Sequence, residues 1–253
     1  MLLDNRYAFV TEIGMTYCVA MRLESGMVFL ADSRTNAGVD HIATFRKMFT
    51  FVQPGQRAIV LMSAGNLATT QSVISLLRTR ANSDLPNLMN CASLYDAAEL
   101  VGRTVREVVT RDAGQEQTGV DFGCTFILGG QIQGEEMRLF HIYSEGNFIE
   151  STQDTPYFQI GELKYGKPII DRVISFQSSV DQAIKCSLIS MDSTIRSNLS
   201  VGLPLDLLSY ERDALNAGSR YDIDENHPGY KALREGWSQG LKGTFETLPE
   251  IVW

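Results

Sequence analysis

The chain is poor in the residues that build metal centres and disulfide frameworks. Its 253 residues include four cysteines and three histidines, and none of them stands at CxxC or Cys/His ligand spacing. We therefore expect reduced, buried cysteines in a cytoplasmic protein, with no metal and no cofactor. The sequence also contains no nucleotide-binding motif.

Long apolar runs and basic runs are missing as well. No apolar stretch approaches the roughly 18 residues that cross a bilayer, so we expect no membrane partner. Acidic residues outnumber basic residues by 30 to 22, and the resulting net charge of −8 argues against a nucleic-acid partner. The remaining composition, 44% hydrophobic and 21% charged, is typical of a globular protein with a large core.

The N-terminal segment has no basic start and no apolar core, so it does not resemble a secretory signal peptide. Three interpretations of residues 1–15 stay open. Met15 is the true start and the upstream residues are a start-site artefact; or residues 1–15 are a propeptide that is removed later; or the extension persists and blocks the amine of Thr16, which would make the protein inactive. Residues 16–253 are expected to form a single domain.

The apolar pattern predicts blocks of strands followed by blocks of helices. Alternating stretches indicate strands, the first two of which are joined by a turn at Gly26, and stretches with a helical period indicate helices. The expected strands are 15–23, 27–34, 42–51, 57–63, 123–128, 137–143, 148–151, 200–211 and 219–224, and the expected helices are 67–80, 94–110, a short one followed by 178–196, and one after Pro228.

This order of elements predicts how the chain packs. The first four strands are consecutive, which suggests that they share one antiparallel sheet, and the helix after Pro228 is expected to cover the end of the molecule. The most economical packing is an α+β fold, a four-layer αββα sandwich of two antiparallel sheets flanked by helices.

The head of the first strand carries a candidate nucleophile, Thr16, directly behind Met15. Once the preceding residue is removed, Thr16 has a hydroxyl and a free α-amine with an unperturbed pKa of about 8, which is close enough to neutral to act as a general base. A threonine behind a methionine is also common at ordinary start sites, so Thr16 alone decides little.

Four short segments stand in a characteristic order and spacing, namely Thr16, Ala31–Arg34, Phe45–Lys47 and Ser63–Asn66. Together they resemble the proteasome β-subunit family of N-terminal nucleophile hydrolases. Segments 160–168, 190–202 and 233–241 are similar to one branch of it, the bacterial proteasome-related Anbu proteins, which are relatives of HslV. The resemblance extends from Met15 to Trp253 and implies the N-terminal nucleophile hydrolase fold.

The resemblance implies a catalytic role for four residues. Thr16 would attack a peptide carbonyl, and its own amine, through a water, would accept the proton. Asp32 would hold the neighbouring lysine and the head of the first strand, and the Lys47 ammonium would favour the alkoxide, although its spacing from Thr16 is one residue shorter than the commoner one. The Gly65 N–H would stabilise the oxyanion.

Each of these residues also has an ordinary structural interpretation. Asp32 could be a turn former or a surface acid, Lys47 could lie on the solvated face of a strand, and Gly65 could simply permit a turn. The combination and the spacing favour catalysis over these separate explanations.

Two family segments are altered in this chain. The usual Gly-Ser-Gly segment is replaced by Gly161-Glu162-Leu163, where Glu162 is either a hydrogen-bond acceptor or a subunit contact. The nearest counterpart of a late Asp-x-x-Ser-Gly segment is 197–202, which offers Ser197 and Ser200 as further candidates but has no matching aspartate.

The resemblance implies a threonine-type endopeptidase that acts on a peptide or unfolded protein inside a homo-oligomer, either a ring or a helical stack. It leaves open whether an ATP-dependent unfoldase docks on the assembly. Two alternatives stay open: a non-catalytic assembly or binding module with the same fold, and an amidase that acts on a small amide.

Overall fold

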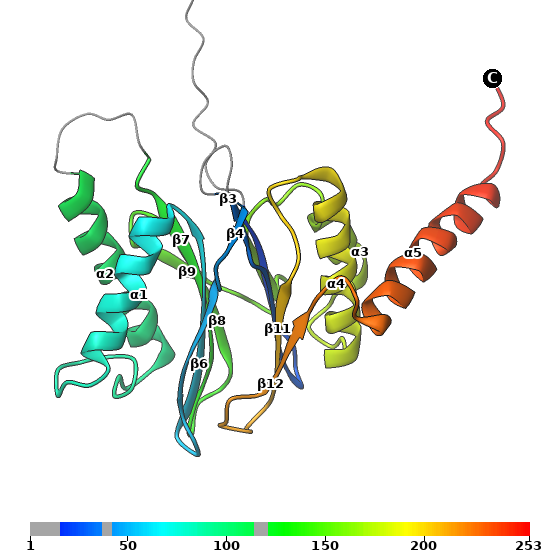
Figure 1. The fold of residues 1–253 in the computed structure, drawn as a ribbon. Helices are drawn as coiled ribbons and strands as arrows, with labels where there is room; N and C mark the ends of the chain where they lie inside the picture. The colour runs from blue at the N-terminus through cyan, green and yellow to red at the C-terminus, as the bar shows by residue number, and fades with distance from the viewer. Residues whose placement is uncertain (1–15, 37–41, 114–120) are drawn as a thin grey trace, which may run out of the picture.

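The computed structural model describes residues 16–36, 42–113 and 121–253. These residues form two five-stranded antiparallel sheets and a two-stranded ribbon. The two large sheets are stacked face to face, with helices on both outer sides (Figure 1). The predicted α+β fold, a four-layer αββα sandwich, is therefore confirmed. The predicted extension, residues 1–15, lies outside the described residues.

The first sheet has the strand order β10, β1, β2, β11, β12, and the second has the order β5, β6, β7, β8, β9. The first sheet consists of β1 (Tyr17–Arg22), β2 (Gly26–Asp32), β10 (Tyr157–Gly161), β11 (Leu205–Glu211) and β12 (Ser219–Ile223). The second consists of β5 (Met48–Gln53), β6 (Arg57–Gly65), β7 (Cys124–Ile132), β8 (Arg138–Ile142) and β9 (Phe148–Glu150). The ribbon between them consists of β3 (Arg34–Asn36) and β4 (Ile42–Thr44).

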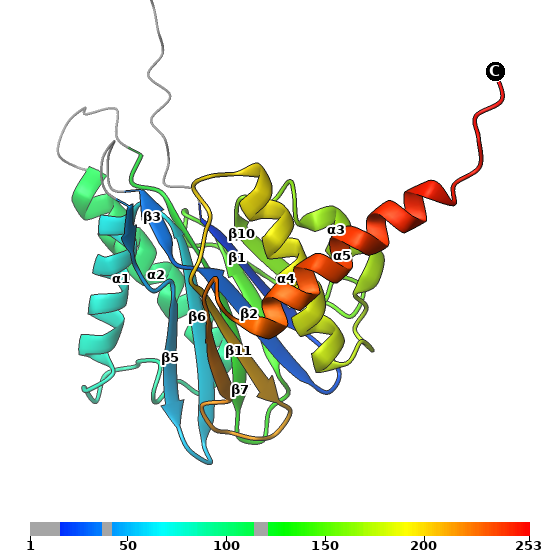
Figure 2. The same ribbon diagram turned by 45° about the vertical axis from the view of Figure 1, so that its right-hand side comes forward.

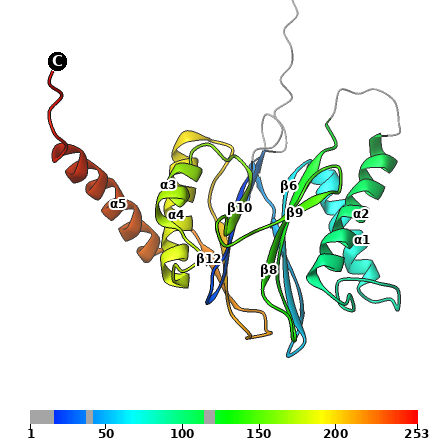
Figure 3. The same ribbon diagram turned by 180° about the vertical axis from the view of Figure 1, so that it is seen from behind.

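The helices cover the outer face of each sheet. Helices α1 (Leu67–Arg80) and α2 (Leu94–Ala113) pack on the second sheet, and α3 (Lys167–Val173) and α4 (Val180–Ser197) pack on the first, as the view from behind also shows (Figure 3). Helix α1 has the bounds that the sequence pattern predicts. It begins there because the Asn66 side chain accepts the Thr69 N–H and caps the helix.

The core lies in three layers, two between a sheet and its helices and one between the sheets. Strand β1 shows why. Cys18 and Ala20 face the second sheet, whereas Val19 and Met21 face the helices, so the strand is buried on both faces. Such a strand needs a cover on each side, and only a layered sandwich provides both.

The expectation that the first four strands share one sheet is wrong. β1 pairs with β2 in the first sheet, whereas β5 pairs with β6 in the second. The chain crosses between the sheets by way of the β3–β4 ribbon. Because β1 and β2 are apolar on both faces, they need the second sheet as a cover and not as an extension of their own sheet.

The strand expected at 42–51 is interrupted. β4 ends at Thr44 and β5 begins at Met48. Between them the Phe45 N–H bonds to the Ser33 carbonyl at 2.9 Å, and the Lys47 side chain turns into the interior, where it is 8% exposed. A buried ionic partner for Lys47 thus outweighs the alternating apolar pattern.

Two further differences concern the first sheet. The strand expected at 200–211 begins at Leu205, because the preceding Gly202 N–H faces the Asp32 side chain and not a neighbouring strand. Strand β10 was not expected at all. It is five residues long and pairs with β1, which lies far away in the sequence.

Helix α5 (Pro228–Glu246) does not cover the end of the molecule as expected. It projects away from the sandwich toward the C-terminus (Figure 2). Tyr230, in its first turn, is its buried residue, while Leu241 and Phe245 further along are 51% and 77% exposed. Within the described part of the chain, no helix has the length and apolar character that a membrane crossing requires.

His141 on β8 provides a pH-dependent test of this core. Its ring lies 4.4 Å from the Tyr143 ring, between centroids, and its Nε2 is buried without a hydrogen-bond partner in the structure. Burial lowers the pKa of His141 below its ordinary value. The unfolded chain therefore binds a proton first as the pH falls, and stability decreases below about pH 6.5.

We expect His141→Phe to remove part of this loss, at most ~1.4 kcal/mol per pH unit. The measurement is the free energy of chemical unfolding at pH 7.5 and 5.5, at a fixed protein concentration. His227→Asn is the control, since His227 is exposed and Asn retains an acceptor for the α5 cap that His227 supplies. An unchanged pH dependence in His141→Phe would contradict the prediction.

Candidate functional site

Thr16 lies at the head of β1, where two strands hold its backbone. Its carbonyl accepts the Glu162 N–H at 2.7 Å, and the next residue, Tyr17, pairs with Gly161 at the end of β10. Thr16 is 6% exposed. The backbone of Thr16 is therefore fixed by β1, which begins at the next residue, and by the end of the neighbouring strand β10.

Gly161 makes this close approach possible. Its φ of +86° lies in the left-handed region, and a Cβ at this position would stand 1.8 Å from the Thr16 carbonyl oxygen. Both the backbone conformation and the space thus require glycine. The glycine of the altered 161–163 segment therefore has a direct structural role beside Thr16.

We expect Gly161→Ala to lower the free energy of unfolding by about 3 kcal/mol or more, because left-handed strain adds to a clash with backbone. Gly134→Ala is a matched control. Gly134 has a φ of +82°, and a Cβ added there would meet nothing within 4 Å, so it should cost only the strain of ~1 kcal/mol. Chemical unfolding of both variants measures the difference. Equal losses of unfolding free energy in the two variants would show that a Cβ at position 161 does not clash with the Thr16 carbonyl.

Asp32, the last residue of β2, gathers three donors beneath Thr16. Its Oδ1 accepts the Tyr17 N–H at 3.0 Å and the Lys47 Nζ at 2.7 Å, and its Oδ2 faces the Gly202 N–H at 3.4 Å. The carboxylate is fully buried. Burial raises the pKa of Asp32, and the Lys47 ammonium and the two backbone N–H groups act in the opposite direction.

Lys47 brings a positive charge to the same place. Besides Asp32, its ammonium donates to the Arg34 carbonyl at 2.7 Å, so two acceptors fix it. The side chain is 8% exposed, which rules out the solvated-face interpretation. A buried ion pair gains little net stability against the cost of desolvating both charges, and buried acids with a raised pKa, such as Asp32, concentrate at functional sites.

Glu162 links Thr16 to the loop that follows α4. Its Oε2 accepts the Asn198 Nδ2 at 3.1 Å and its Oε1 accepts the Lys164 N–H at 3.2 Å, while Asn198 Oδ1 accepts the Ser200 N–H at 2.9 Å. Glu162 is 7% exposed. These contacts favour the hydrogen-bond acceptor of the two interpretations left open for Glu162.

Sequence reasoning missed three contributors to this site. Asn198 bonds to Glu162, the Gly202 N–H faces Asp32, and Arg34 supplies a carbonyl to Lys47 and a guanidinium that donates to the Leu199 carbonyl at 2.9 Å. Both Asn198 and Gly202 lie inside the 197–202 segment, so the sequence pointed to the right segment but to its serines as the candidates.

The remaining predicted site residues are Ser197, Ser200 and Gly65. Ser197 is exposed at the end of α4, whereas Ser200 is half-buried in the loop that Asn198 organises. Gly65 ends β6 with a φ of +105°. The Cys18 thiol faces the Ser63 carbonyl at 3.8 Å, so β1 and β6 are in contact two residues from Thr16 and two residues from Gly65.

The described residues contain no group of three or more His, Cys, Asp and Glu side chains that could hold a metal ion. The buried cysteines of this region also have no sign of a reactive thiolate. Burial raises the pKa of Cys124 to about 12, and it raises the pKa of Cys18 as well. The groups that the structure gathers beside Thr16 are the Asp32 carboxylate, the Lys47 ammonium and backbone N–H groups.

Two antiparallel sheets between helical layers, with a threonine at the head of a central strand above a buried Asp–Lys pair, define the N-terminal nucleophile hydrolase fold. Solved structures agree. The chain is 60% identical to Anbu, the ancestral beta-subunit, from Yersinia bercovieri, with a TM-score of 0.89 over 94% of this chain and 100% of that one. The chain therefore belongs to the Anbu family, a proteasome-related branch.

Other members of the family are similarly close. The subunit in the helical assembly of the Anbu complex from Pseudomonas aeruginosa is 54% identical, with a TM-score of 0.91 over 94% of this chain and 98% of that one. Anbu from Hyphomicrobium sp. strain MC1 is 48% identical, with a TM-score of 0.87 over 94% and 100%. No protein-family model and no curated protein matches the chain.

Proposed function

We propose that the protein is a threonine peptidase of the proteasome type, with Thr16 as its N-terminal nucleophile. One observation carries the proposal. The Thr16 carbonyl is held by the Glu162 N–H, while the next backbone N–H and the Lys47 ammonium meet on the same oxygen of Asp32. A residue fixed on both sides next to a buried ammonium is prepared for nucleophilic chemistry.

The reaction proceeds in two steps. The Thr16 hydroxyl oxygen attacks the peptide carbonyl carbon, and its proton passes to the Thr16 α-amine through a water. The tetrahedral intermediate collapses, the C–N bond breaks, and the leaving amine takes that proton. A water molecule then attacks the resulting ester, which releases the acid and restores the hydroxyl.

The neighbouring groups stabilise charge in these steps. The Lys47 ammonium favours the developing alkoxide of Thr16, and Asp32 holds the ammonium in place through its 2.7 Å contact with the Lys47 Nζ. The Gly65 N–H is the proposed donor to the oxyanion, and the loss of such a donor typically costs about 3 kcal/mol of transition-state stabilisation.

This mechanism requires a free amine on Thr16, and we propose that the active chain begins there. The proposal therefore takes up the two interpretations in which residues 1–15 are not part of the active protein.

We further propose that the protein works as a homo-oligomer that hydrolyses peptides or unfolded protein. The Pseudomonas relative forms a helical assembly. In this chain the end of α5 and the segment after it expose large apolar side chains that a single chain leaves uncovered, an arrangement typical of interaction surfaces. They are Leu241, Phe245, Leu248, Ile251, Val252 and Trp253.

Identification of newly formed termini tests the proposal. The purified oligomer is incubated with an unfolded protein and with short peptides, and mass spectrometry identifies the products. Peptidase activity predicts new amino termini that do not form with the Thr16→Ala variant. Cleavage of small amides alone would point to an amidase, and equal background in both proteins would leave a non-catalytic assembly module.

A further inference from the structure

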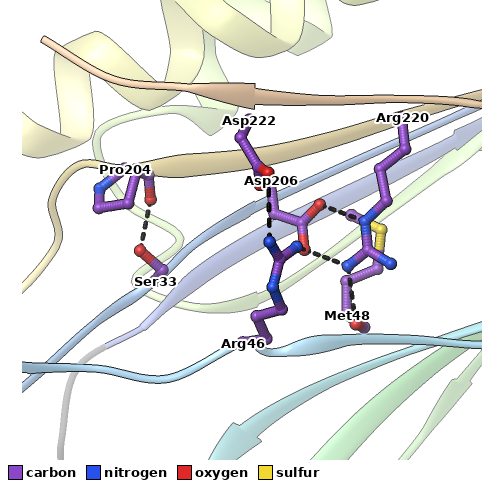
Figure 4. Close-up of polar contacts among 7 residues, drawn as sticks. All are labelled: Ser33, Arg46, Met48, Pro204, Asp206, Arg220 and Asp222. Carbon is purple, nitrogen blue, oxygen red and sulfur yellow. Dashed lines mark hydrogen bonds and ion pairs between the residues drawn. The ribbon is translucent and has the colours of Figure 1, made fainter.

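Asp206, the second residue of β11, is a buried acid outside the group around Thr16. It is 3% exposed. Its Oδ1 accepts the Arg220 Nε at 2.7 Å, its Oδ2 accepts the Arg220 Nη2, and the same Oδ2 accepts the Arg46 Nη1 at 3.4 Å. Figure 4 shows both arginines converging on this carboxylate, with Asp222, the ladder partner of Asp206 on β12, also contacting Arg46.

Arg220 connects this acid to the segment that carries Lys47. Its Nη2 also donates to the Met48 carbonyl at 3.1 Å (Figure 4). Met48 begins β5, an edge strand of the second sheet, and Arg220 lies on β12, an edge strand of the first. The contact therefore spans the two sheets, at the residue that directly follows Lys47.

The same part of β11 also fixes the partner of Lys47. Leu205 pairs with Asp32, and Asp206 pairs with Ala31, in the ladder between β11 and β2. The Ser33 hydroxyl donates to the Pro204 carbonyl at 2.6 Å just before this ladder (Figure 4). Strand β11 thus contributes to the position of Asp32 through its backbone, and through the Asp206–Arg220 pair it contacts Met48, which β6 also holds.

The segment that carries Lys47, between the end of β4 and the start of β5, is short and irregular. Phe45–Lys47 lies outside β4 and β5, and one backbone bond holds it at each end, from the Phe45 N–H to the Ser33 carbonyl at 2.9 Å and from the Ser63 N–H to the Lys47 carbonyl at 3.0 Å. An arginine–carboxylate fork has a defined geometry, and it adds a side-chain anchor at Met48 to these few backbone bonds.

We propose that Asp206 is a positioning residue that, through Arg220 and the Met48 carbonyl, holds the Lys47 ammonium on Asp32. Asp206 does not touch the reacting atoms. It determines where the charge next to Thr16 stands, because a shift of the Met48 backbone moves Lys47 with it. Its effect on reactivity, although not its effect on Lys47, rests on the proposed function.

Asp206→Asn tests the inference, because it keeps the shape of the side chain and removes the charge that holds the fork. Arg220→Lys is a second variant that keeps the charge and removes the fork geometry. Glu150→Gln is the control. It weakens another forked pair, Arg138–Glu150, with distances of 2.7 and 2.6 Å, on strands β8 and β9 away from this edge.

The first readout is independent of activity. The full-length protein is treated with an acetylating ester, and the acetylation rate of Lys47 is measured by peptide mass spectrometry against exposed lysines in the same digest. We expect Asp206→Asn to raise the rate at Lys47 by about tenfold, because the loss of a charge-assisted contact loosens the segment. Glu150→Gln should leave it unchanged.

The second readout is the reaction of Thr16 with a β-lactone probe. We expect Asp206→Asn to lower the maximal rate of inactivation by ~10-fold to 100-fold and to leave the half-saturating probe concentration unchanged. Arg220→Lys should change both readouts in the same direction. If Asp206→Asn fails to fold, Arg220→Lys alone tests the inference.

The two readouts separate the inference from the proposed function. If the wild-type protein never reacts with the probe, the proposed function fails, and a faster acetylation of Lys47 in Asp206→Asn still supports the positioning role. If the Lys47 rate is the same in Asp206→Asn, Arg220→Lys and wild type, the inference is overturned, whether or not the probe reacts.

Discussion

Replacing Thr16 with alanine should lower peptide hydrolysis by at least about a thousandfold, because the substitution removes the only atom proposed to form a bond with the substrate. Thr16→Ser keeps both the hydroxyl and the α-amine, so it should retain activity within about tenfold of the wild type. The measurement is kcat/KM for a cleaved peptide identified from the new termini.

Thr50→Ala controls for the loss of a threonine hydroxyl in general, since Thr50 is exposed on β5. It should have wild-type activity. The oligomer size of each variant is compared by light scattering, so that a loss of assembly is not mistaken for a loss of the nucleophile. Full activity in a correctly assembled Thr16→Ala variant would rule out the mechanism.

Replacing Lys47 with methionine should affect both stability and reactivity. The variant leaves the Asp32 carboxylate buried without its ionic partner, and removing one member of a buried pair typically costs about 3–5 kcal/mol of unfolding free energy. The rate of Thr16 modification by the probe should fall by about 100-fold or more, because no ammonium then favours the alkoxide.

A double variant separates these two effects. Asp32→Asn combined with Lys47→Met removes both charges and keeps an acceptor for the Tyr17 N–H that Asp32 holds at 3.0 Å. We expect it to regain much of the lost stability and none of the lost reactivity. If reactivity returned together with stability, the ammonium would have only a structural role.

Local patterns in the sequence were sufficient to predict most elements. Helix α1 has its predicted bounds because its apolar residues recur at helical spacing and Asn66 caps it, and both signals lie within a few residues of each other. The partition of the strands into sheets was not predictable in the same way. It depends on which faces of β1 and β2 are buried, and therefore on elements that come much later in the chain.

The site shows the same division between local and distant signals. The expectation that Asp32 holds Lys47 and the head of the first strand agrees with the contacts in the structure, while the catalytic roles stay predictions. The contacts of Asp32 with Gly202, 170 residues away, and of Glu162 with Asn198 come from the packing of β10, β11 and α4. No motif spacing encodes such contacts.

The measurement that tests the central claim most directly is the intact mass of the protein from its own host, before and after reaction with an epoxyketone or β-lactone directed at N-terminal threonine. The account predicts a chain that begins at Thr16 and gains the mass of one probe, and it predicts no gain in the Thr16→Ala variant. A chain that retains residues before Thr16, or one that begins there and never reacts, would contradict the assignment of a threonine peptidase.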